Sequence, residues 1–102
     1  KVGDYDSAAG ILLQLDMPEA IALRGLIHEF KEQNTQAMAL YQKLATAQNL
    51  PSSYQLRYAV LLENSGSLAV AQQWYQHYLT LPDQPTAARQ FAAQRKLALS
   101  NR

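Results

Sequence analysis

Two stretches of the chain decide the fold: GLIHEFKEQNTQAMALY from Gly25 to Tyr41, and AVLLENSGSLAVAQQWY from Ala59 to Tyr75. Each begins with a small residue, has an alanine 12 positions later, and ends with a tyrosine four positions after that alanine. Small residues at these points allow two antiparallel helices to approach closely, and the tyrosine ring fills the space beyond them. Gly25 and Ala59, Ala37 and Ala71, and Tyr41 and Tyr75 are all related by the same offset of 34 in the numbering.

Turn-forming residues divide the rest of the chain into segments whose apolar residues recur at helical spacing, which predicts six helices. Good helix formers are plentiful, and the β-branched residues typical of strands are scarce. Side chains of Asp4, of Asn34 or Thr35, and of Ser67 are expected to cap helices, and Gly66 to end one in the left-handed conformation. The expected helices run from Tyr5 to Leu15, from Pro18 to near Gln33, from Asn34 or Thr35 to the Asn49-Leu50-Pro51 break, from Ser52 or Ser53 to Gly66, from Ser67 to the stretch 81–85, and from Pro85 onward.

The last helix is expected to cover its neighbour as a terminal cap, because its small and apolar residues fall on one side and its charges on the other. The inward residues would be Ala87, Ala88, Phe91 and Ala98. Arg89 and Lys96 would then lie opposite, in water.

Composition limits the classes of protein to consider. The 102 residues carry a formal net charge of +1, so no strong overall field attracts nucleic acid or an anionic membrane. No apolar stretch approaches the roughly 20 residues needed to span a bilayer, and we expect no membrane insertion. Cysteine is absent, which fits the cytoplasm and the bacterial periplasm equally. Because Lys1 opens the chain without a leader sequence, we expect a domain excised from a larger protein.

The offset of 34 and the residues related by it resemble the tetratricopeptide repeat family. The opening Gly3-Asp4-Tyr5-Asp6-Ser7-Ala8 is similar to the family's turn into its second helix, and Pro51 and Pro82 fall where a repeat ends. Departures from the family's pattern also occur. Its first-helix Trp is replaced by Ile21 and Gln55, its Leu by Arg24 and Tyr58, and its third small residue by Leu44 and Tyr78.

This resemblance implies an all-α fold of antiparallel helix-turn-helix repeats stacked as a short right-handed superhelix, with a C-terminal capping helix. The whole chain, 1–102, would form a single domain. It would consist of a partial repeat at 3–17, full repeats at 18–51 and 52–84, and the capping helix at 85–102. An irregular helical bundle, with the offset a coincidence, is the alternative fold.

In the family, partners bind in a concave groove lined by the first helix of each repeat. Carried over by position, the resemblance assigns the partner-binding groove to twelve residues. They are Glu19, Ala22, Leu23, Leu26, Glu29 and Phe30 on one helix, and Ser53, Leu56, Arg57, Val60, Glu63 and Asn64 on the other.

The helical wheel independently places Leu56 and Val60 nearly opposite the stripe of Tyr54, Tyr58 and Leu61 that the core requires. Apolar residues opposite a core stripe indicate a contact surface. An apolar groove rimmed by Glu19, Glu29 and Glu63 would favour an amphipathic helix with basic flanks. Flanking repeats, or a second copy in a homo-oligomer, are equally good candidates to cover it.

We find no pattern typical of catalysis, metal binding or a cofactor. His28 and His77 are the only histidines, and they lack the spacing of paired metal ligands. Glu29 and Glu32 fall on one helix, where a solvated face is the simpler interpretation. The aromatic residues Trp74, Tyr75 and Tyr78 have the spacing of core residues rather than of a stacking site for a ligand.

The sequence therefore predicts a non-catalytic scaffold or adaptor that binds another protein or a peptide. By family resemblance alone, bacterial envelope, secretion or pilus assembly is a plausible setting. An accessory helical domain of a larger enzyme is an alternative. Weak nucleic-acid binding through the basic last helix is another, although four cations without interleaved aromatic residues are a poor footprint for it. Those cations are Arg89, Arg95, Lys96 and Arg102.

Overall fold

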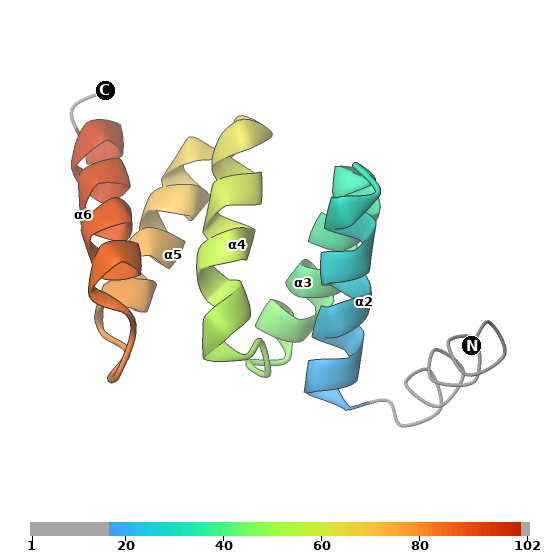
Figure 1. The fold of residues 1–102 in the computed structure, drawn as a ribbon. Coiled ribbons are helices and arrows are strands. Elements are labelled where there is room, and N and C mark those ends of the chain that lie inside the picture. The colour runs from blue at the N-terminus through green and yellow to red at the C-terminus, as the bar shows by residue number, and fades with distance from the viewer. Residues whose placement is uncertain (1–16, 101–102) are drawn as a thin grey trace, which may run out of the picture. The chain divides into compact units, whose positions relative to one another are not determined.

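A computed structural model of the chain describes residues 17–100, and over that range it is all-helical, with five α-helices and no strand (Figure 1). The helices are α2 (Pro18–Phe30), α3 (Asn34–Thr46), α4 (Ser52–Asn64), α5 (Leu68–Leu79) and α6 (Thr86–Ser100). The all-α prediction is confirmed for this part of the chain. The helix expected from Tyr5 to Leu15 and its cap Asp4 lie outside the described residues.

The chain divides into two compact units, with the boundary between Pro51 and Ser52. In the first unit α2 packs against α3. In the second unit α4 packs against α5, and α5 packs in turn against α6. Among residues 17–100, each unit therefore contains a two-helix hairpin, and the second unit adds one further helix.

The offset of 34 seen in the sequence reappears in the helix bounds. Pro18, Ser52 and Thr86 begin α2, α4 and α6, and each of these starts follows the one before it by that offset. The same offset relates the ends of α2 and α4, at Phe30 and Asn64, and the starts of α3 and α5, at Asn34 and Leu68. The helices of the two hairpins therefore begin and end at equivalent positions of the repeat.

The turns inside the two hairpins match as well. Glu32 has a φ of 59°, and Gly66, at the equivalent place in the second hairpin, has a φ of 92°. In each turn the next amide reaches back over five residues to a carbonyl of the first helix, from Gln33 to His28 at 2.8 Å and from Ser67 to Leu62 at 2.9 Å. This left-handed ending satisfies carbonyl groups that the helix itself leaves unpaired. The left-handed ending predicted at Gly66 is confirmed.

The second helix of each hairpin buries the residues that the sequence pattern selected. Ala37 and Tyr41 in α3, and Ala71 and Tyr75 in α5, have no exposed surface. Gly25 is needed for this packing, because a Cβ added there would lie 2.6 Å from Cε1 of Tyr41. At that distance atoms overlap, so the glycine allows the tyrosine ring to rest directly on the backbone of α2.

Helix capping differs from the prediction. α3 begins at Asn34 with Gln33 at its N-cap, so neither Asn34 nor Thr35 occupies the capping position. Ser67 does occupy the N-cap of α5, but its side chain makes no capping hydrogen bond. α3 and α5 each begin directly after a turn with a left-handed residue, Glu32 or Gly66. The geometry of this turn, rather than a side-chain cap, sets where each helix begins. α2 also ends at Phe30, before the expected Gln33.

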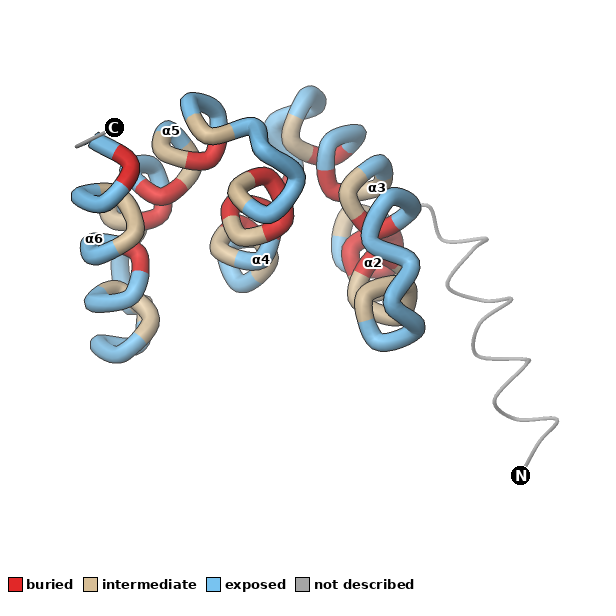
Figure 2. Tube along the Cα trace, turned by 90° about the horizontal axis from the view of Figure 1, so that it is seen from above, coloured by how far each residue is buried: buried red, intermediate tan, exposed pale blue. Residues whose placement is uncertain are grey.

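The inward face of α6 was predicted wrongly. Its buried residues are Ala92 and Leu99, whereas Phe91 remains 41% exposed. Figure 2 shows α6 as mostly pale blue and tan. Arg89 does not extend into water, because its guanidinium donates hydrogen bonds to the carbonyls of Leu81 at 2.9 Å and Leu79 at 3.2 Å. The remaining predicted inward residues are exposed at Ala87 and Ala98 and half-buried at Ala88.

None of the helices between residues 17 and 100 is both long enough and apolar enough to cross a membrane.

Candidate interaction surface

The residues expected to contact a partner from α2 differ widely in exposure. Phe30 is 74% exposed, and Glu19 is also exposed. Leu23, Leu26 and Glu29 are half-buried. Ala22 has no exposed surface, so its expected contact with a partner is not available in this conformation. The accessible apolar part of α2 is therefore centred on Phe30 rather than on Ala22.

On α4, the corresponding residues keep more of their surface in solvent. Ser53, Arg57 and Asn64 are exposed. Leu56, Val60 and Glu63 are half-buried. Leu61 and Leu62, by contrast, are buried. The apolar pair Leu56 and Val60 is thus partly accessible, as an interaction surface requires.

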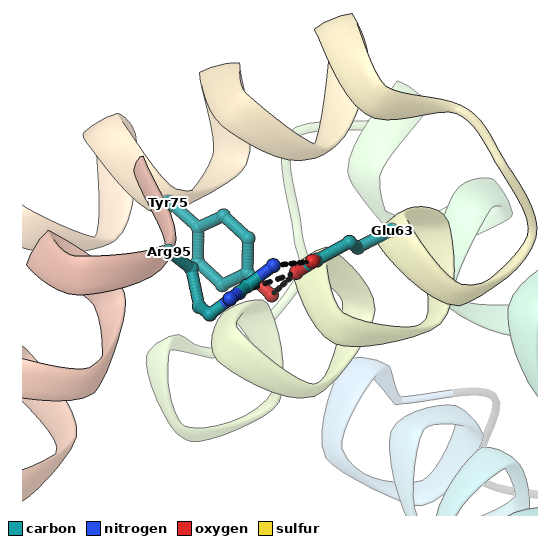
Figure 3. Close-up of polar contacts among 3 residues, drawn as sticks. All are labelled: Glu63, Tyr75 and Arg95. Carbon is teal, nitrogen blue, oxygen red and sulfur yellow. Dashed lines mark hydrogen bonds and ion pairs between the residues drawn. The ribbon is translucent and has the colours of Figure 1, made fainter. Parts of the chain in front are cut away.

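The two glutamates of these sets are held by their own hairpins. The hydroxyl of Tyr41 donates a hydrogen bond of 2.6 Å to Oε2 of Glu29, and the hydroxyl of Tyr75 donates one of 2.7 Å to Oε1 of Glu63 (Figure 3). In both pairs the tyrosine follows the glutamate by 12 positions. Adding 34 to the residue numbers of the first pair gives those of the second. A carboxylate bound in this way fixes the end of the first helix against the middle of the second.

Arg95 joins the second of these pairs from α6. Its Nε donates to Oε1 of Glu63 at 3.1 Å, and its terminal nitrogen forms an ion pair with Oε2 of the same carboxylate. Figure 3 shows the guanidinium and the tyrosine hydroxyl meeting at the glutamate, with one residue from each of α4, α5 and α6. We call Glu63, Tyr75 and Arg95 the three-residue cluster.

The cluster shifts the ionisation of two of its members. Burial and the neighbouring Glu63 carboxylate raise the pKa of Tyr75 well above its ordinary value of 10.0. The hydrogen bond and charge of Glu63 also raise the pKa of Arg95. Tyr75 therefore stays a neutral donor and Arg95 a cation over the whole ordinary pH range.

Aromatic side chains form a separate group between α4 and α5. The rings of Tyr58 and Trp74 meet edge to face, with centroids 5.2 Å apart, and Trp74 meets His77 in the same way at 5.5 Å. Tyr58 is buried, and burial raises its pKa. The predicted role of Trp74, Tyr75 and Tyr78 in packing agrees with the burial of both tyrosines, while Trp74 is half-buried.

No group of three or more His, Asp or Glu side chains between residues 17 and 100 is placed to hold a metal ion. Nδ1 of His28 lies 2.7 Å from Oε1 of Gln33, which accounts for that histidine as part of the turn after α2.

Sequence reasoning missed the tyrosine–glutamate hydrogen bonds, although the signal for them was present. The offset that aligns Tyr41 with Tyr75 also aligns Glu29 with Glu63. A glutamate that precedes a tyrosine at one fixed separation, found in both hairpins, is the pattern that predicts this bond. No comparable signal existed for Arg95, because the offset of 34 aligns it with Leu61 and Ile27 rather than with another arginine.

Comparisons with protein-family models, with curated protein sequences and with solved structures found no match for this chain.

Proposed function

We propose that this chain is a tetratricopeptide-like repeat module that binds another protein, without catalytic activity of its own. The observation that carries the proposal is the repetition of one hairpin at an offset of 34, in helix bounds, turn geometry and the tyrosine–glutamate bond. The family that uses this period builds modules for protein–protein interaction from such hairpins.

The two helices of each hairpin differ in burial, and this difference supports the same function. The second helices bury the alanine and tyrosine of the repeated pattern completely: Ala37 and Tyr41 in α3, and Ala71 and Tyr75 in α5. The first helices keep apolar residues partly or largely in solvent, namely Phe30 in α2 and Leu56 and Val60 in α4. Apolar surface that a folded hairpin leaves uncovered favours contact with another chain. We therefore propose that the partner, a peptide segment or a helix, binds to the first helices.

The charge expected around this surface is altered by the three-residue cluster. Arg95 compensates Glu63, and Glu29 is shared with a tyrosine hydroxyl. Of the three carboxylates expected to select basic flanks in a partner, Glu19 is the exposed one. We accordingly propose that apolar contact, rather than attraction of basic residues, supplies most of the binding free energy.

Affinity capture with the full chain, followed by mass spectrometry, would identify a partner. Calorimetry with the identified segment would then test the surface. Phe30→Ala and Leu56→Ala change one first helix each, and Val70→Ala, at a residue 42% exposed on the second helix α5, is the matched control. We expect each first-helix variant to weaken binding by about tenfold, as truncation of an interface anchor does, and the control to leave it unchanged.

Circular dichroism of each variant would establish that the helices remain folded. Unchanged affinity in both first-helix variants would remove the proposed surface. A loss of affinity only in Val70→Ala would place the partner on the second helices instead.

A further inference from the structure

α6 is joined to its unit with little apolar burial. Its only buried residues are Ala92 and Leu99, while Leu97 is 64% exposed and Phe91 41% exposed. Polar contacts add to these two buried apolar side chains in holding α6 against its unit.

The polar contacts of α6 lie both near its start and in its second half. Near its start, Arg89 donates to the carbonyls of Leu79 and Leu81, which lie at the connection from α5. This contact holds the end of α6 that the chain already tethers. The other half of α6 is held by Arg95, bound to Glu63, and by a hydrogen bond between Ser100 and Gln72.

The carboxylate of Glu63 is the centre of the contact in that half. Its two oxygens accept bonds from Tyr75 of α5 and from two nitrogens of Arg95 of α6. The side chains of Arg95 and Glu63 are 34% and 16% exposed, so the pair is partly shielded from water. Charge-assisted bonds of this kind are about twice as strong as neutral ones. Two of these bonds come from α6 and one from α5, so the charge of Glu63 contributes directly to the contact with α6.

We propose that α6 is a releasable helix, docked through the charge pair of Glu63 and Arg95, which separates from a hairpin of α4 and α5 that stays folded. The connection between α5 and α6, from Thr80 to Pro85, contains no helix, and Asp83 within it has a φ of 60°. Residues in that left-handed conformation store strain that a change of loop geometry relieves.

Release of α6 uncovers a defined surface. Phe91 meets Tyr75 edge to face, with ring centroids 6.2 Å apart, and Tyr75 has no exposed surface while α6 is docked. Undocking therefore exposes an aromatic face of α5. The device controls access to α5, and it stands independently of the surface proposed on the first helices.

Amide hydrogen exchange of the full chain, followed residue by residue by NMR, tests this directly. Glu63→Gln keeps an oxygen that accepts the Tyr75 hydroxyl and removes the charge that Arg95 needs. We expect exchange in the second half of α6 to rise about tenfold, the factor that corresponds to losing one charged hydrogen bond, with α4 and α5 changed by less than about twofold.

Glu29→Gln is the matched control, because it makes the same change at the equivalent position of the first hairpin and also keeps the acceptor for its tyrosine. It is expected to leave exchange in α6 unchanged. Arg95→Lys keeps the charge but loses the two-pronged geometry, so it should fall between the wild type and Glu63→Gln. Should Glu63→Gln fail to fold, Arg95→Met removes the same pair from the α6 side and gives the same readout.

Three results would overturn the proposal. Unchanged exchange in α6 would mean that the charge pair does not hold the helix. An equal rise in α4, α5 and α6 would mean that α6 opens only with the whole unit. An equal rise in α6 caused by Glu29→Gln would mean that the effect is not specific to the cluster.

Discussion

The sharpest consequence of the packing concerns Gly25. A methyl group added there would lie 2.6, 3.0 and 3.1 Å from three ring carbons of Tyr41, a side chain with no exposed surface. The ring cannot simply turn aside, because its hydroxyl is bonded to Glu29 at 2.6 Å. Gly25→Ala must therefore either shift α2 away from α3 or break that bond.

Two opposing terms set the size of the effect. Replacing glycine by alanine inside a helix ordinarily stabilises by about 1 kcal/mol. Forcing an extra carbon into a well-packed site costs about 1–3 kcal/mol. We expect overpacking to win, with a net loss of up to about 2 kcal/mol in the free energy of unfolding of the first unit. If the ring did not contact Gly25, the same substitution would stabilise the protein. The sign of the change in the free energy of unfolding therefore shows whether this contact exists.

Hydrogen exchange of the amides of α2 and α3 is the suitable assay, since it reports on the first unit separately from the second. Ala59→Gly is the matched control at the equivalent position of the second hairpin, where the native side chain is already a fully buried alanine. It should also destabilise, by about 1–2 kcal/mol, because it removes a buried methyl group and lowers helix propensity. An increase in protection of α2 and α3 in Gly25→Ala would mean that the ring of Tyr41 does not rest on the backbone at Gly25.

Three further predictions concern turns, ionisation and the start of α6. Glu32→Gly should stabilise the first unit by about 1 kcal/mol in thermal unfolding, because Glu32 has the left-handed backbone (φ of 59°) that Gly66 provides at no steric cost in the other hairpin. Tyr58 and Tyr75 have raised pKa values when folded, so they keep their protons where the unfolded chain would lose them. Their contribution is complete below about pH 10, and stability should fall as the pH rises above it; urea unfolding at pH 9 and pH 11 would check this, and equal stability at both would contradict it. Arg89→Met should cost about 1 kcal/mol, seen in urea unfolding followed by the fluorescence of the single tryptophan, because it removes two bonds to backbone carbonyls.

The helices themselves could be predicted from the sequence because their signals are local. Pro18 marked the start of α2, and Gly66 marked the left-handed turn before α5. The offset of 34 then related the two hairpins and identified Tyr41 and Tyr75 as buried. Periodicity, turn residues and repetition can all be found in the sequence without knowing how the helices pack.

What could not be predicted depends on how a helix is rotated against its neighbour. α6 turns Ala92 and Leu99 inward instead of Phe91, because Arg89 and Arg95 find acceptors on α5 and α4. Those acceptors are two backbone carbonyls and a glutamate distant in the sequence, and no sequence pattern indicates them. Glutamate at position 32 in a left-handed turn is a similar case, since its backbone follows from the hairpin geometry rather than from its own preference.

The repeated hairpin itself is tested most directly by the nuclear Overhauser contacts of the two tyrosine rings in the full chain. We expect the ring of Tyr41 to contact the backbone of Gly25 and the side chain of Glu29. The ring of Tyr75 should make the equivalent contacts in the second hairpin, with Ala59 and Glu63. Contacts in one hairpin that are absent from the other, or that are displaced by a residue, would contradict the claim that one structural unit occurs twice.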